Sequence, residues 1–129
     1  MSNLSIKEFS DLVYDKLDEL NYEIVLSNPQ TEDNTDELIE MHTPLKSTNR
    51  TVNAIPIKST FQMSITCWNK GQRDCMEMTN EIEEKLQELN FVRTNTSSSI
   101  YDSIMQKYAI TVTFEVRYNG LTNSFEYIR

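Results

Sequence analysis

Apolar residues recur every three or four positions in two stretches of the chain. The first stretch contains Ile6, Phe9, Val13, Leu17 and Leu20, and the second contains Cys75, Met78, Ile82, Leu86 and Leu89. Because this spacing puts the apolar side chains on one face of a helix, it predicts amphipathic helices over about 5–20 and 72–89. Ser5 and Glu8 have the spacing of a capping box, which marks the start of the first helix.

Elsewhere apolar and polar residues alternate, which predicts strands with one buried face. The two clearest strands run over 60–68 and 108–118. Shorter strands are expected at 22–26, 38–42 and 91–93, and a polar turn at 94–99. Asn119 and Gly120 are typical of a hairpin turn, so the segment 121–129 either pairs back as a last strand or leaves the body as an arm.

The order of these elements indicates one domain over residues 1–129. A chain of this length, with 38% hydrophobic residues, is suited to a single core. We expect an α+β fold, a mainly antiparallel sheet with two amphipathic helices on one face. Residues 16–22 also resemble residues 85–91, with five of seven positions identical at an offset of 69. The echo reflects either a shared local way to end a helix or two related helix-to-strand units on one sheet.

The charge of the chain, formally −8, is distributed unevenly along it. Residues 1–40 contain eleven acids and two bases, whereas no acid occurs between Glu40 and Asp74. The acid-free stretch is either an ordinary solvated surface or a basic segment. A basic segment would dock against an acidic face of the same subunit or of a neighbour.

The first part of that stretch, residues 44–58, is bracketed by Pro44 and Pro56 and is mostly polar. Because it has too little apolar content to fold alone, we expect a mobile arm or hairpin that becomes ordered on assembly. The candidate contacts with another subunit or partner are Lys46, Arg50, Lys58 and Trp68. Trp68 ends a strand on its polar side, where it is either an interface anchor or buried against a helix.

Residue counts exclude several classes of chemistry. With only Gly71 and Gly120 present, the chain has no glycine-rich phosphate loop. A single histidine, His42, and two cysteines exclude most catalytic triads and structural zinc sites. Cys67 and Cys75 both fall on apolar faces and are predicted to be core residues. We therefore expect no catalytic residue, no metal and no cofactor.

Three further classes of partner or location are not favoured by the sequence. No apolar run approaches the roughly 20 residues of a membrane span, so no membrane partner is expected. Residues 1–7 lack the apolar core of a signal peptide, which favours a cytoplasmic chain with reduced thiols. An acidic chain gains little from counterion release, so sequence-specific binding to nucleic acid is not expected.

The layout of nearly the whole chain resembles a known family. An amphipathic helix opens the chain, the strand over 61–68 leads into the second helix, and a long alternating strand runs into the turn at 117–120. In length and element order this layout resembles the tail terminator, or tail-completion, proteins of long-tailed bacteriophages. The resemblance implies an α+β subunit that closes with its own copies into a ring, a hexamer, without any catalytic residue. Such a ring caps the tail tube and joins it to the head–tail connector in the virion, after assembly in the host cytoplasm.

Two alternatives are a phage head–tail connector or neck protein, and a small regulatory or ligand-binding α+β domain. A ring needs a head-to-tail interface, in which one patch meets a different patch on the next copy. Separated acidic and basic segments suit such an interface. An acidic channel wall would also let DNA slide rather than stick.

Overall fold

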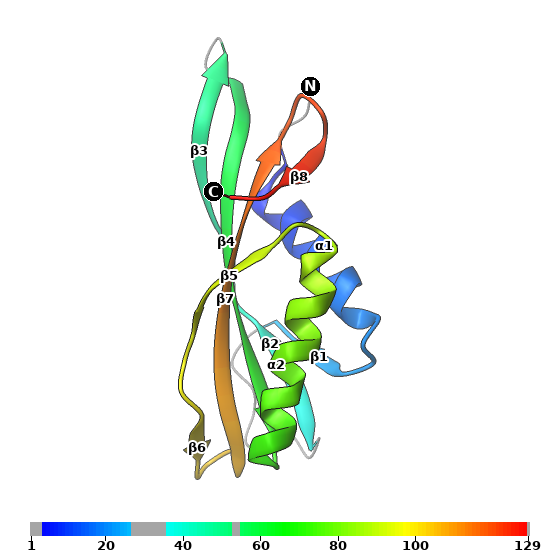
Figure 1. The fold of residues 1–129 in the computed structure, drawn as a ribbon, viewed down its shortest axis with the longest axis vertical. Helices are drawn as coiled ribbons and strands as arrows, with labels where there is room; N and C mark the ends of the chain where they lie inside the picture. The colour runs from blue at the N-terminus through cyan, green and yellow to red at the C-terminus, as the bar shows by residue number, and fades with distance from the viewer. Residues whose placement is uncertain (1–3, 27–35, 53–54, 129) are drawn as a thin grey trace.

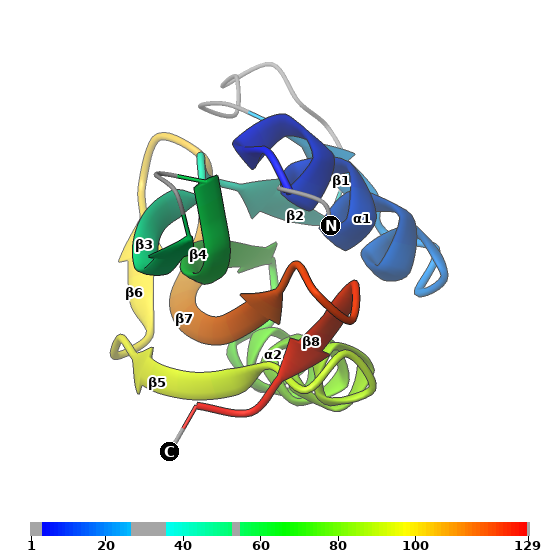
Figure 2. The same cartoon turned by 90° about the horizontal axis from the view of Figure 1, so that it is seen from above.

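The computed structural model describes residues 4–26, 36–52 and 55–128. Within these residues the chain forms an α+β fold of two helices and an eight-stranded, mostly antiparallel sheet. Both helices lie on the same face of the sheet, as Figures 1 and 2 show from two directions. The expected fold class is therefore confirmed.

The two helices are α1, Ile6–Asp18, and α2, Gln72–Gln87. A capping box opens α1, because Ser5 Oγ accepts from the Glu8 backbone N–H and Glu8 Oε1 accepts from the Ser5 backbone N–H, each at 3.0 Å. Beyond each helix the chain makes a tighter final turn and reaches an asparagine with positive φ, 64° at Asn21 and 66° at Asn90. Both helices thus lie within the predicted ranges, and each ends two residues before the predicted end, at Asp18 and Gln87.

Two long antiparallel strands form the centre of the sheet. They are β4, Ile55–Asn69, and β7, Lys107–Asn119. Their register runs from Lys58 opposite Asn119 to Asn69 opposite Tyr108. The remaining strands flank this pair and are shorter, so β4 and β7 set the length of the molecule (Figure 1).

Different short strands occupy the two outer edges of the central pair. Along β4 lie β3, Leu45–Val52, and β2, Glu37–Met41, and β2 in turn pairs in parallel with β1, Glu23–Val25. Along β7 lie β5, Val92–Thr96, β6, Ile100–Asp102, and β8, Ser124–Glu126. All the pairings except that of β1 with β2 are antiparallel.

The core lies between the helices and one face of the sheet. Odd-numbered residues of β4 and even-numbered residues of β7 contribute to it, together with the apolar faces of both helices. At one end of the core four phenylalanines meet: Phe9, Phe61, Phe91 and Phe125. The Phe9 ring stacks on Phe61 with centroids 4.2 Å apart and on Phe91 at 5.5 Å, and Phe125 meets it edge-on. This cluster joins α1 to the sheet and to the segment that follows α2.

Several strand predictions change once the sheet is assembled. Residues 94–99 were expected to be a polar turn, but β5 continues to Thr96 and β6 follows at Ile100, because both pair with β7 through backbone hydrogen bonds that need no apolar side chains. The segment after the 119–120 turn pairs back, since β8 lies along the end of β7. Residues 45–52 and 55–58 form part of the β3–β4 hairpin, which extends past the helices in Figure 1. Whether the hairpin moves before assembly stays a prediction.

Candidate functional site

A buried carboxylate lies on the face of the sheet that the helices leave uncovered. Glu40, in β2, is only 4% exposed, and its Oε1 accepts a hydrogen bond from Trp68 Nε1 at 3.0 Å. The register explains the contact, because Leu38 and Glu40 of β2 lie opposite Trp68 and Thr66 of β4. The hydrogen bond compensates part of the cost of removing the carboxylate from water. Trp68 therefore lies on the face without helices, and the alternative of burial against a helix is wrong.

The single histidine connects this carboxylate to a row of hydroxyl groups. His42 Nδ1 lies 3.8 Å from Glu40 Oε2, and His42 Nε2 lies 2.8 Å from Thr66 Oγ1. Thr66 Oγ1 lies 2.9 Å from Thr111 Oγ1 on the neighbouring strand. The same register places Ser64 Oγ 3.0 Å from the Thr113 hydroxyl, one step farther along the two strands.

Carboxylate, imidazole and hydroxyl follow one another in the order found in nucleophilic triads, but the geometry favours a structural role. The distance from Glu40 to Nδ1 exceeds that of a hydrogen bond, and the carboxylate is held by Trp68 instead. Thr66 is 5% exposed and has Thr111 on its other side, so its hydroxyl is not presented to a substrate. The network supplies cross-strand hydrogen bonds that hold β2, β4 and β7 together.

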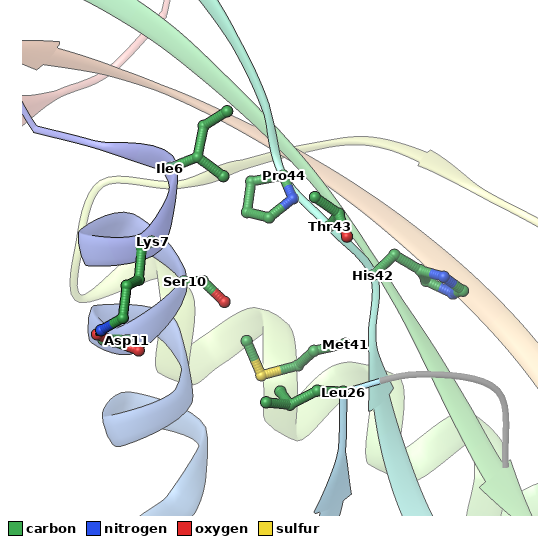
Figure 3. Close-up of a pocket in the computed structure, with 9 residues that line it drawn as sticks. All are labelled: Ile6, Lys7, Ser10, Asp11, Leu26, Met41, His42, Thr43 and Pro44. Carbon is green, nitrogen blue, oxygen red and sulfur yellow. The ribbon is translucent and has the colours of Figure 1, made fainter.

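A groove opens beside this network, between α1 and the segment that connects β2 to β3. Its volume is about 560 Å³, and its lining residues are Ile6, Lys7, Ser10, Asp11, Leu26, Met41, His42, Thr43 and Pro44. Figure 3 shows Ile6 and Ser10 on the helix side, Pro44 and Thr43 across from them, and Leu26 beside Met41. The volume lies within the range of about 300–1,000 Å³ for pockets that hold small ligands.

The groove combines an apolar interior with a charged edge. Ile6 and Leu26 are exposed apolar side chains, and Met41 lies beneath them and is buried. Lys7 and Asp11 form an ion pair at the edge, with Lys7 Nζ 2.9 Å from Asp11 Oδ2. Because that pair is neutral as a unit, the groove is best suited to an uncharged apolar group.

The four predicted interface residues lie in two places. Lys46 and Lys58 lie in the β3–β4 hairpin, and Trp68 lies about 30 Å farther along β4, ten residues from Lys58. Arg50 pairs in β3 through its backbone, and its side chain lies outside the described residues. The structure therefore does not gather these residues into one surface.

Two of the basic groups in that set have partners within their own chain. Lys46 Nζ donates to the Leu4 carbonyl at 2.7 Å and lies 5.6 Å from the centre of the Phe61 ring. Burial lowers the pKa of Lys46, and Glu8 opposes this effect. Lys58 Nζ lies 3.5 Å from Glu126 Oε1. A role for these lysines in contacts with another subunit stays a prediction.

The sequence reasoning missed the turn between β6 and β7. Three apolar side chains project from β6 and from this turn: Ile100 is 61% exposed, Tyr101 53% and Ile104 70%. We call these three residues the apolar tip. In the sequence these residues appear as an Ile-Tyr pair and a further isoleucine inside a polar stretch. Their exposure follows only from the pairing of β6 with β7, which the sequence pattern does not contain.

Both cysteines are core residues, as predicted. Cys67 and Cys75 are fully buried, and Cys75 Sγ donates to the Cys67 carbonyl at 3.2 Å. Burial raises the pKa of both thiols, that of Cys75 to about 11. Because the thiolate is the reactive form, neither sulfur is activated as a nucleophile or a metal ligand.

In the described parts of the chain, no three histidine, cysteine, aspartate or glutamate side chains come together as metal ligands would. None of the described helices has the length and apolar character to span a membrane. The chain matches no protein-family model and no curated protein sequence.

Proposed function

We propose that this protein is a structural subunit of a long-tailed bacteriophage, a tail terminator. Its copies close into a hexameric ring that caps the tail tube, joins it to the head–tail connector and remains in the virion. In this role the chain is not an enzyme and needs no cofactor. The proposal begins from the resemblance of this chain to tail terminator proteins in length and element order. The elements that carry it are the strand over 61–68, the second helix and the strand that runs into 117–120.

The observation that carries the proposal furthest is the presence of two unlike apolar surfaces on one subunit. The groove beside α1 is concave, whereas the apolar tip between β6 and β7 is convex. A ring forms when one patch of a subunit meets a different patch of the next, and a subunit that carries both kinds of surface meets that requirement. His42 is hydrogen-bonded to Thr66 and both cysteines are buried, which also favours a role without bond chemistry.

The charge of the subunit is compatible with a passage for DNA. A net charge of −8 gives an assembled ring a negative field, which disfavours tight binding to phosphates. DNA would then slide through the ring instead of adhering to its wall.

The test is the oligomeric state of the purified full chain. Analytical ultracentrifugation with light scattering should give a mass six times that of the 15.1 kDa subunit, and negative-stain images should show rings. Isolated tail tubes capped by these rings should no longer lengthen when tube protein is added. A chain that stays monomeric at all concentrations and does not bind tubes would contradict the proposal.

The groove gives one alternative specific support. Its volume and apolar interior also suit a small regulatory or ligand-binding domain. Native mass spectrometry of the protein as purified distinguishes the two functions. A monomer that carries a stoichiometric apolar ligand favours the ligand-binding domain, and a ligand-free ring favours the structural subunit.

A further inference from the structure

The turn at the apolar tip is held in one conformation by its own backbone and by Asp102. Asp102 Oδ1 accepts from the backbone N–H groups of Ile104 and Met105, both at 2.9 Å, and the Gln106 N–H donates to the Asp102 carbonyl at 2.7 Å. Met105 is buried, so the turn is also anchored from below. A turn with this support loses little conformational entropy when it binds.

The apolar tip has the shape of a knob. Ile104 is the most exposed of its side chains and lies in the turn itself, and Ile100 and Tyr101 leave the strand on opposite faces. Tyr101 is braced by the Tyr108 ring, which it meets edge-on at 5.1 Å. An aromatic and two aliphatic side chains on a rigid hairpin are typical of interface anchors.

The charge around the apolar tip also limits what it can contact. Asp102 and Lys107 are the only charged residues of 98–107; the Asp102 carboxylate accepts backbone hydrogen bonds and Lys107 is buried. The groove, in turn, lies beside α1, where Asp15 and Asp18 are exposed and Asp11 pairs with Lys7. An acidic segment would be repelled there, whereas a nearly uncharged apolar tip can enter.

The apolar tip and the groove cannot meet within one chain. The tip lies at the lower end of the molecule in Figure 1, and the first turn of α1, which forms one wall of the groove, lies in the upper half. A contact between them therefore joins two copies and is heterologous.

We propose that the apolar tip of one copy docks in the groove of the next copy, and that this contact repeats around the ring. The inference rests on the proposed function. Ile104 enters between Ile6 and Pro44, and Ile100 and Tyr101 cover the two rims. A stable interface buries about 1,200–2,000 Å² of accessible surface, and three side chains bury far less, so a single contact is weak. Ring closure gives every subunit two such contacts, which stabilises the assembly without a stable dimer.

Disulfide trapping tests the pairing directly. Ser10→Cys in the groove and Ile104→Cys in the turn introduce one accessible thiol each, and the native cysteines are fully buried. After mild oxidation, a mixture of the two variants should give a linked dimer, and a chain with both substitutions should give a ladder up to the ring. Ser10→Cys mixed with Leu121→Cys is the matched control, because Leu121 is 58% exposed in another hairpin turn.

The strength of the contact is tested by Ile104→Ser against Leu121→Ser. In ultracentrifugation, Ile104→Ser should weaken self-association by about tenfold or more, whereas Leu121→Ser should leave it unchanged. Circular dichroism should match the parent for both variants, since both side chains are exposed. Rings that form normally with Ile104→Ser, or equally strong trapping by each thiol variant alone, would overturn the docking contact and leave the proposed ring intact. A parent chain that is monomeric at every concentration would overturn both.

Discussion

The two helix-to-strand units of this protein share a local sequence but differ in their place in the fold. Residues 16–22 end α1 and lead into β1, and residues 85–91 end α2 and lead into β5. The turn after each helix reaches an asparagine with positive φ, Asn21 or Asn90. β1, however, is an edge strand parallel to β2, whereas β5 pairs antiparallel with the central strand β7. The local sequence thus sets how each helix ends, and the sheet decides how the next strand pairs.

The repeated lysine and glutamate also meet across the two units. Lys16 Nζ lies 2.8 Å from Glu88 Oε1, and Lys85 Nζ lies 3.1 Å from Glu19 Oε1. Glu19 and Glu88 occupy equivalent positions in the two units, and each lysine contacts the glutamate of the opposite unit. This reciprocal contact is compatible with two related helix-to-strand units on one sheet, the alternative that the sequence echo alone left open.

The aromatic residue after each asparagine shows the clearest difference. Phe91 is 2% exposed and stacks within the phenylalanine cluster. Tyr22 is half-buried, and its hydroxyl donates to Glu81 Oε2 of α2 at 2.6 Å. One unit thus inserts its ring into the core, and the other uses a polar tip to attach the end of α1 to α2.

The largest expected effect comes from removing the buried ring. Phe91→Ala should lower the free energy of unfolding by about 3–5 kcal/mol, because it leaves a cavity beside Phe9. Tyr22→Ala should cost clearly less, since its ring is partly exposed. Urea unfolding followed by circular dichroism measures both variants. Equal losses would mean that the two units contribute alike to the core.

The asparagines with positive φ should show the second-largest effect. Asn21→Ala should cost about 1–2 kcal/mol, because an alanine side chain is strained in the left-handed region, and Asn90→Ala should cost more because it also removes a hydrogen bond. Asn21→Gly should be nearly neutral. Asn90→Gly should still cost about 0.5–1.5 kcal/mol, since Asn90 Nδ2 donates to the Phe125 carbonyl at 2.9 Å. Chemical denaturation measures the free energy of unfolding of each variant. Equal losses for Asn21→Gly and Asn90→Gly would contradict a stabilising role of the Asn90 hydrogen bond.

The tyrosine of the first unit predicts a pH dependence. Burial, and then the hydrogen bond to Glu81, raise the pKa of Tyr22 in the folded chain above the ordinary value of 10.0. The folded state therefore keeps this proton at a pH where the unfolded chain loses it, so stability present below pH 10 falls as the pH rises above it. Tyr22→Phe should flatten that decline in thermal unfolding between pH 9 and 11, roughly the range that spans the tyrosine pKa. Tyr127→Phe, at an exposed ring, is the control and should leave the decline unchanged.

The smallest effect is expected at the reciprocal ion pairs. Lys16→Met should weaken the contact with Glu88, and Lys85→Met the contact with Glu19, with little loss of stability because both glutamates are largely exposed. A double-mutant cycle of Lys16 with Glu88 at low and high salt measures the coupling. The coupling should decrease as salt screens it. A coupling that does not depend on salt would show that the contact is not chiefly electrostatic.

The positions of the helices and the apolar faces of the long strands could be predicted because their signals are local. The 3.6-residue period of Phe9, Val13 and Leu17, and the alternation through Val112, Phe114 and Val116, record which side chains face the core. By contrast, β5, β6 and β8 are short, and the apolar side chains of β6 are exposed and do not face the core. Their pairing with β7 depends on backbone groups that every sequence possesses, so the residue pattern indicated the start of β5 and left β8 as one of two alternatives, but it did not indicate β6.

The candidate surfaces were predictable to a smaller extent. Lys46 and Lys58 were expected to meet a partner because no acid lies near them in sequence, yet Leu4, Phe61 and Glu126 reach them in space. The groove draws its walls from α1, the end of β1 and the β2–β3 connection. Segments this far apart come together only through the sheet register, which a local pattern does not contain.

The sequence by itself determined the α+β class, the capped start of α1, the turn that ends each helix and the burial of both cysteines. These features depend on contacts between residues close in the chain, or on the period of apolar positions, and both can be read without a fold. Only the tertiary structure decided that Glu40 is buried against Trp68, that the two repeated units meet through exchanged ion pairs, and that Ile104 projects from a rigid turn. Each of these depends on which strands pair, and that choice is made by the packing of the whole chain at once.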